Sequence, residues 1–190
     1  MDREEIMRMF EKTGALLRGH FELSSGLHSD QYLQCALVLQ HPEYAVSLCG
    51  QLASKFKEDG PDVVVGPALG GIVVSYEVAK ALDARSIFCE RRDGKMTLRR
   101  GFSVATNDKV LVVEDVITTG ASVKEIIEIM RQSGARVIGV GAICDRSSGP
   151  IDFGARFESL IKLDIQSFSP RDCPLCKDGI PIHKPGTRRR

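Results

Sequence analysis

Residues 109–122 read KVLVVEDVITTGAS, and this stretch decides which fold the chain can adopt. The apolar run at 110–113 is typical of a β-strand that is covered on both faces. Two adjacent carboxylates, Glu114 and Asp115, stand at its end. A turn of small residues follows, and the apolar residues after it repeat at helical spacing. The stretch therefore predicts a buried strand, a tight turn and an amphipathic helix.

Two further apolar runs, at residues 63–65 and 137–143, lie before and after this stretch. Segments of helical periodicity adjoin the runs, such as the one that begins at Pro42 and stops before Gly60. Strands that alternate with helices pair in parallel through right-handed crossovers. The chain is therefore expected to have an α/β fold, with a mostly parallel central sheet flanked by helices. Ligands of such sheets bind beyond the carboxyl ends of the strands.

The N-terminal residues follow a different pattern. Apolar side chains from Ile6 to Leu17 predict a first amphipathic helix that ends before Gly19. Short strands joined by a turn are expected between Phe21 and Val38, where they would form a small hood.

Composition limits the kind of protein. Apolar residues make up 43% of the 190 residues and charged residues 27%, which is ordinary for a folded globular chain. The formal net charge is only +1, so neither nucleic acid nor a membrane surface is expected as a partner. The chain shows no apolar run of about eighteen residues and no secretion signal, and a cytoplasmic protein is expected. We expect one domain, with a helix and hood at about residues 1–40, a core at about 42–146 and a C-terminal extension at 147–190.

The turn after the two acids has the properties of a phosphate site. Residues 118–122 are small, and they precede a helix whose first N–H groups and positive dipole end favour an anion. Glu114 and Asp115 would repel each other unless a cation or hydroxyl groups compensated them, as the vicinal hydroxyls of a ribose would. A helix capped by Thr119 or Ser122 is a plainer explanation, but it leaves the paired acids unexplained. The glycine spacings of P-loop and dinucleotide-binding enzymes are missing.

Two other segments suggest anion binding. A glycine-rich turn at residues 66–72, GPALGGI, can present N–H groups to an anion, although close packing would also select it. Asp93-Gly94 is a strong hairpin signal. Five cations surround it, namely Arg91, Arg92, Lys95, Arg99 and Arg100. Such an arm would neutralise a departing pyrophosphate, unless it is only a solvated hairpin.

The strand, the two acids and Thr118-Thr119-Gly120 resemble the phosphoribosyl pyrophosphate signature of type I phosphoribosyltransferases. The resemblance implies the type I phosphoribosyltransferase fold and a site for phosphoribosyl pyrophosphate. The residues that it assigns to this site are Glu114, Asp115, Val116, Ile117, Thr118, Thr119, Gly120, Ala121, Ser122, Gly70, Gly71, Arg91, Arg92 and Lys95. It also implies Mg²⁺ as cofactor, held mainly by the substrate and without a direct protein ligand.

Residues 19–40, GHFELSSGLHSDQYLQCALVLQ, and Cys144-Asp145-Arg146 resemble the base-binding parts of orotate phosphoribosyltransferases. The resemblance implies transfer of the phosphoribosyl group to orotate in pyrimidine (UMP) biosynthesis. Thr118 and Arg146 would contact orotate, because a planar guanidinium meets a carboxylate well. A local ion pair with Asp145 is the alternative for Arg146.

The same resemblance implies catalytic roles for Asp115 and Lys95. It further implies a homodimer in which Arg91, Arg92 and Lys95 reach the neighbouring subunit's active site. Some relatives carry a histidine in this loop and a lysine in the hood, whereas this chain has neither and shows Ser24-Ser25-Gly26 in the hood.

Cys173 and Cys176, with His183 nearby, suggest a zinc site, but structural zinc needs four ligands and no second cysteine pair is close in sequence. Reduced structural thiols are therefore expected, and a thioredoxin-like context for redox chemistry is lacking. His28 is expected to be a surface histidine.

Two other functions stay open at this point. A phosphoribosyltransferase for a purine or for uracil would share the phosphate segment but lack the hood and Arg146. A non-catalytic regulator would sense phosphoribosyl pyrophosphate while it binds nucleic acid, although the near-neutral charge speaks against it.

Overall fold

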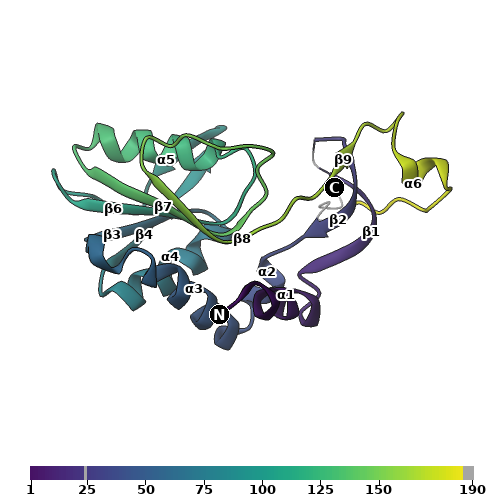
Figure 1. Cartoon of the computed structure of the whole chain (residues 1–190). Helices are drawn as coiled ribbons and strands as arrows, with labels where there is room; N and C mark the ends of the chain where they lie inside the picture. Colours follow the sequence, from purple (N-terminus) through teal and green to yellow (C-terminus); the bar gives the residue numbers. More distant parts are fainter. Residues whose placement is uncertain (24, 186–190) are drawn as a thin grey trace.

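A six-stranded sheet forms the centre of the molecule in the computed structural model, which describes residues 1–23 and 25–185 (Figure 1). The strand order is β5-β4-β3-β6-β7-β8. All neighbouring strands pair in parallel except β5, which runs antiparallel to β4. The strands are β3 (Val63–Pro67), β4 (Arg85–Arg92), β5 (Lys95–Leu98), β6 (Lys109–Ile117), β7 (Arg136–Asp145) and β8 (Arg156–Lys162).

Helices cover both faces of this sheet. Helices α3 (Pro42–Ser54) and α4 (Gly70–Leu82) pack on one face, and α5 (Ala121–Gln132) packs on the other (Figure 1). The side chains of β6 alternate between the layers: Leu111 belongs to the core beneath α3 and α4, and Val112 belongs to the core beneath α5. Both are fully buried, so the expected parallel α/β architecture is confirmed.

The hood is a smaller unit beside the carboxyl end of the sheet (Figure 1). Its three strands have the order β1-β2-β9 and pair antiparallel. Its elements come from both ends of the chain: α1 (Arg3–Lys12), β1 (Leu16–Glu22), β2 (His28–Leu33) and α2 (Ala36–Leu39) from the first forty residues, and β9 (Ser167–Phe168) and α6 (Pro174–Lys177) from the last thirty. Ser24 lies outside the described residues. A short 3-10 helix, η1 (Lys57–Asp59), follows α3.

Two segments differ from what the sequence predicts. The first helix ends at Lys12, and Leu16 and Leu17 lie in β1, because Gly14 turns the chain with φ +68°. The central sheet continues past residue 146 into β8, whose side chains are mostly half-buried and give no continuous apolar run.

The expected hairpin at Asp93-Gly94 is confirmed, since Arg92 pairs with Lys95 across it.

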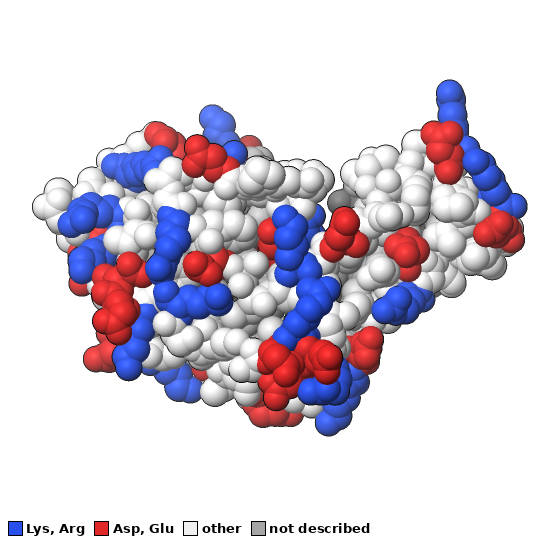
Figure 2. Space-filling view, in the orientation of Figure 1, with Lys and Arg blue, Asp and Glu red and all other residues white. Residues whose placement is uncertain are grey.

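Among the described residues, no helix has the length and apolar character needed to cross a lipid bilayer. Figure 2 shows Lys and Arg interspersed with Asp and Glu over one face of the core, and an indentation where the core meets the hood.

Candidate active site

The two acids of β6 lie at the carboxyl end of the sheet, where the fold places ligands. The side chain of Glu114 is only 9% exposed. Burial, and then the neighbouring Asp115, raise the pKa of Glu114 to about 10. Among the described residues, the backbone hydrogen bonds that these carboxylates accept are local, from Asp115 N–H to Glu114 Oε1 (3.2 Å) and from Val116 N–H to Asp115 Oδ1 (2.9 Å). The pair is therefore arranged for a ligand that brings hydroxyl groups or positive charge.

The glycine-rich turn between β3 and α4 packs directly against these acids. A Cβ atom added to Gly70 would lie 2.5 Å from Oδ2 of Asp115. Within the turn, a Cβ on Gly66 would lie 2.4 Å from the carbonyl oxygen of Gly71. Only glycine allows these approaches, so the structure brings together the two segments that the sequence predicts to bind phosphate groups. The Ala68–Leu69 peptide bond in this turn is cis.

The turn from β6 into α5 forms a small hollow. Gly120 is the N-cap of α5 with φ +73°, and a Cβ there would lie 2.8 Å from the ring of Phe153. A cavity of about 80 Å³ opens against residues 116–123 and Glu114. The N-terminal N–H groups of α5 point toward such a site, and its volume suits a group of a few atoms such as phosphate.

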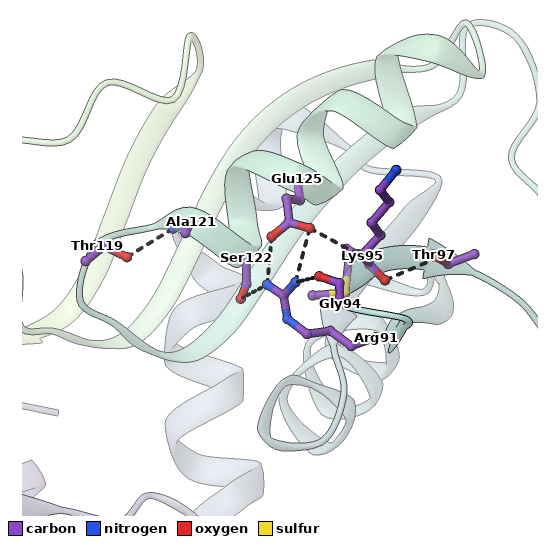
Figure 3. A network of polar contacts seen from close by, with 9 residues as sticks. Arg91, Gly94, Lys95, Thr97, Thr119, Ala121, Ser122 and Glu125 are labelled. Atoms are coloured by element: carbon purple, nitrogen blue, oxygen red, sulfur yellow. Dashed lines mark hydrogen bonds and ion pairs between the residues drawn. The ribbon is translucent and has the colours of Figure 1, made fainter. Parts of the chain in front are cut away.

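The basic hairpin lies beside this turn in the same chain (Figure 3). Arg91 pairs with Glu125 of α5 at 2.7 Å, donates to the carbonyl of Gly94 at 2.7 Å, and reaches Ser122 Oγ at 3.4 Å. Arg91 lowers the pKa of Glu125. Figure 3 shows the Lys95 side chain pointing away from this network. The structure therefore places Arg91 beside the turn at residues 118–122 of its own chain, although Arg91, Arg92 and Lys95 are all exposed.

Glu125 was not singled out from the sequence. Its position one turn into the helix, opposite a cluster of arginines, is the signal that would have found it.

The remaining hairpin cations also have partners, because Arg99 and Arg100 both pair with Glu90.

A cleft of about 790 Å³ separates the hood from the core. Thr118, Thr119 and Arg146 line it from the core, and Tyr32 and Leu27 line it from the hood. Its described walls also include Glu22, Leu23, Ser25, Leu33, Ser147, Ser148, Asp164, Ile165, Ser167, Lys184 and Pro185.

Arg146 is the cation that the core contributes to this cleft, and Lys184 lies in the wall formed by the C-terminal residues. The alternative of a local pair with Asp145 fails, because Asp145 pairs with Lys162 at 3.5 Å and accepts from Ser147 N–H at 2.8 Å. The buried Nε of Arg146 has no hydrogen-bond partner in the part of the chain that the structure describes. Burial lowers the pKa of Arg146. A half-buried guanidinium whose buried Nε donor is unused favours an anionic ligand in the cleft.

Glu114 and Asp115 suit a hard cation such as Mg²⁺, since both side chains offer carboxylate oxygens.

A second set of possible metal ligands, made of histidines and cysteines, lies in the hood. It includes His28, which is 9% exposed and therefore buried rather than on the surface as expected.

Comparison with known proteins adds independent findings. Residues 38–168 match the family model described as "Phosphoribosyl transferase domain". The chain is 58% identical over 189 residues to an orotate phosphoribosyltransferase of Pelotomaculum thermopropionicum, covering 100% of both chains. It is 56% identical over 183 residues to one of Thermotoga maritima, covering 96% of this chain and 98% of the other.

Solved structures agree with the sequence relatives. The crystal structure of orotate phosphoribosyltransferase from Aeropyrum pernix matches with a TM-score of 0.71 at 27% identity, over 83% of this chain and 93% of that one. The enzyme of Mycobacterium tuberculosis, in complex with inorganic phosphate, matches with a TM-score of 0.68 at 27% identity, over 85% and 96% of the two chains.

Proposed function

The chain belongs to the phosphoribosyl transferase family and, within it, to the orotate phosphoribosyltransferases, and we propose that it carries out their reaction in pyrimidine (UMP) biosynthesis. In this reaction the 5-phosphoribosyl group of phosphoribosyl pyrophosphate is transferred to orotate. A bond forms between a ring nitrogen of orotate and the anomeric carbon of the ribose, and the bond from that carbon to pyrophosphate breaks. The products are orotidine 5'-monophosphate and pyrophosphate.

The observation that carries this proposal is the position of Arg146. It lines the same cleft as Thr118 and Thr119 and has a buried donor that no described residue uses. Orotate carries a carboxylate that a guanidinium can bind with two hydrogen bonds, whereas purines and uracil carry none. The base would therefore lie between the hood and the phosphate turn, with its carboxylate on Arg146.

The remaining residues position the other substrate. The N-terminal N–H groups of α5, with Thr118–Ser122 around them, would hold the 5-phosphate, and Glu114 and Asp115 would accept hydrogen bonds from the ribose hydroxyls. The turn at Gly70 and Gly71 adjoins Asp115, which supports a pyrophosphate site there. No protein nucleophile is required, so the chain contributes positioning, exclusion of water and electrostatic stabilisation.

The proposal includes Mg²⁺. When bound, this cation would supply positive charge to the departing pyrophosphate, and Glu114 and Asp115 would help to hold it indirectly, with the substrate as its main ligand. The raised pKa of Glu114 supports this role, since a buried carboxyl beside a second acid keeps its proton when it has no cation or hydroxyl partner.

We also propose a homodimer in which Arg92 and Lys95 act on the neighbouring subunit's site. Support comes from their exposure and from the direction of Lys95, which points away from the network of its own chain (Figure 3). Val73 and Tyr76 of α4 are 40% and 62% exposed and would suit a surface covered by a second copy. A cytoplasmic location is part of the proposal and is supported by the six cysteines, which form no disulfide bond in the described structure.

The direct test follows the loss of orotate ultraviolet absorbance with purified protein, Mg²⁺ and phosphoribosyl pyrophosphate, in parallel with assays of adenine, hypoxanthine, xanthine and uracil. Turnover of orotate alone is the expected result. Turnover of another base would mean that the enzyme is a phosphoribosyltransferase specific for that base. Turnover of none would favour a non-catalytic regulator.

Asp115→Asn tests the site itself. A hydrogen bond to a charged group contributes about 1.5–3 kcal/mol, so its loss should lower kcat/KM by about 10- to 100-fold. Asp83→Asn is the matched control, because Asp83 ends α4 with φ +55°, a conformation that asparagine also adopts. Undiminished activity of Asp115→Asn would refute the assignment.

A further inference from the structure

Four potential metal ligands meet in the hood, away from the active-site acids. His20 and His28 come from β1 and β2, and Cys173 and Cys176 come from the N-cap and body of α6. One ligand atom of each lies within 4.8 Å of all the others. His20 is 1% exposed and Cys173 is 0% exposed, and His28 is also buried, so three of the four ligands are withdrawn from water while Cys176 is exposed.

The distances within this cluster fit the edges of a metal-centred tetrahedron. His20 Nε2 lies 3.0 Å from His28 Nδ1, 3.5 Å from Cys173 Sγ and 3.7 Å from Cys176 Sγ. Cys176 Sγ lies 3.2 Å from His28 Nδ1. Tetrahedral Zn²⁺, with bonds of about 2.0–2.1 Å to nitrogen and about 2.3 Å to sulfur, requires about 3.3 Å between two nitrogens and about 3.6 Å between nitrogen and sulfur.

The other ring nitrogen of His20 is fixed by the backbone. Its Nδ1 lies 2.7 Å from the carbonyl oxygen of Ile180, and because a carbonyl only accepts, Nδ1 carries the proton. In the neutral ring, Nε2 then presents a lone pair to the cluster. Metal-bound histidines typically donate their second N–H to a carbonyl or carboxylate in this way.

Hydrogen bonds alone do not account for the cluster. Three groups, His28 Nδ1 and the two thiols, converge on the single lone pair of His20 Nε2, and only one of them can donate to it at a time. A cation at the centre would satisfy all four ligand atoms together. All four are nitrogen or sulfur, the donors that Zn²⁺ prefers and Mg²⁺ does not.

We propose that His20, His28, Cys173 and Cys176 bind one Zn²⁺ as a closed structural site. The fourfold set was missed in the sequence because its second ligand pair consists of histidines about 150 residues from the cysteines, rather than of a second cysteine pair. His183, the histidine nearest to the cysteines in sequence, instead pairs through its backbone with His20 and Glu22.

The zinc would join the two parts of the chain that form the hood. Among the described residues, the strand pairing between these parts is short: β9 pairs with β2 at two positions, and His183 joins β1 by an isolated bridge. A structural zinc contributes its binding free energy directly to folding, so it would stabilise a unit that has little core of its own. Because Glu22 and Tyr32 line the cleft, the metal would also fix the wall opposite Arg146.

Metal content is the first test, and it needs no substrate. The protein is produced without a tag in zinc-supplemented cells and purified under reducing conditions. Elemental analysis by inductively coupled plasma mass spectrometry should then find about one zinc per chain. Cys176→Ser and His28→Asn should each lower this to about a tenth or less, since zinc sites need all four ligands. Cys49→Ala and His41→Asn are matched controls outside the cluster and should keep the metal.

A variant that fails to fold would not decide the question, so Co²⁺ substitution of the unaltered chain is the second test. Tetrahedral Co²⁺ with two thiolates should give visible ligand-field bands and near-ultraviolet charge-transfer bands that disappear when zinc is added. Reduced protein without zinc and without these bands would overturn the proposal, as would a Cys173–Cys176 disulfide, seen as the loss of two hydrogens by mass spectrometry.

The structural role has its own readout. Removing zinc with a zinc-selective chelator in excess Mg²⁺ should speed amide hydrogen exchange in residues 16–33 and 167–183 and leave β6 and β7 unchanged. Exchange that rises equally in the sheet, or nowhere, would show that the metal does not hold the hood together. None of these outcomes depends on the transferase reaction, so failure here leaves the proposed function intact.

Discussion

The surroundings of the Glu114 carboxyl oppose its ionised form. It is buried beside Asp115, and its pKa is raised to about 10. A ligand that requires both carboxylates must therefore displace a proton when it binds. The free protein carries this acid pair at a cost in stability, as functional sites often do.

Glu114→Gln should stabilise the free protein. Between the ordinary value of 4.5 and about 10, the unfolded chain has released its proton while the folded chain keeps it. Unfolding is thus increasingly favoured as pH rises through this window, and glutamine removes the effect. We expect a gain of about 1–3 kcal/mol at pH 8 and almost none at pH 4.5, measured by urea unfolding at both values.

The same variant should lose activity, because glutamine cannot supply the negative charge. Equal gains in stability at both pH values would contradict the assigned protonation of Glu114.

Arg146→Gln should act on orotate alone. Loss of a charged hydrogen-bonded pair costs about 1.5–3 kcal/mol, so KM for orotate should rise by about 10- to 100-fold while KM for phosphoribosyl pyrophosphate stays within about twofold. Steady-state kinetics with each substrate varied in turn separates the two effects. Arg136→Gln, at the opposite end of the same strand β7, is the control. A parallel rise in both KM values would mean that Arg146 supports the site as a whole.

At the scale of elements, the β3–α4 turn packs closely against the end of β6. Gly70→Ala would place a methyl group 2.5 Å from Asp115 Oδ2, so one of the two must move. A misplacement of about 1 Å can cost about 100-fold, and kcat/KM for phosphoribosyl pyrophosphate should fall by this order.

Gly50→Ala is the matched control for Gly70→Ala. It lies within α3 with nothing near its added Cβ, and alanine there should stabilise the helix by about 0.5–1 kcal/mol without changing the kinetics. Normal kinetics of Gly70→Ala would show that the turn yields without disturbing the acid.

Elements with local signals were predictable from the sequence. The apolar runs located β3, β6 and β7, because a strand buried on both faces requires consecutive apolar residues. Asp93-Gly94 located the hairpin, because a left-handed turn favours these two residue types. Strand β8 carries no such mark, since it lies at the sheet edge with half-buried side chains. Arg146 was found by resemblance, but its freedom from Asp145 depends on Lys162 of β8 and needed the structure.

At the scale of the whole molecule, the proposed exchange of loops between subunits can be tested by mixing. Lys95→Ala and Asp115→Asn chains should each be nearly inactive alone. If Lys95 acts across a dimer, unfolding and refolding an equal mixture should restore about a quarter of wild-type activity, because half the dimers are hybrids with one intact site each. The readout is orotate turnover at matched protein concentration.

Mixing Asp115→Asn with Arg146→Gln chains provides the control, because both residues belong to one subunit's site and hybrids would contain no intact site. Restoration in the control, or none in the test mixture, would contradict the shared loop.

The hood's composition from both ends of the chain has a consequence for biosynthesis. As the ribosome makes this protein, the six-stranded sheet has all its strands once β8 emerges at residue 162, whereas β1 and β2 still wait for β9 and α6. Domains generally fold as units from the N-terminal side during synthesis. The turns proposed to bind phosphate groups can therefore form on the nascent chain first, whereas the wall proposed to bind the base closes only once β9 and α6 have been made, so these two late elements set the moment at which the enzyme becomes active.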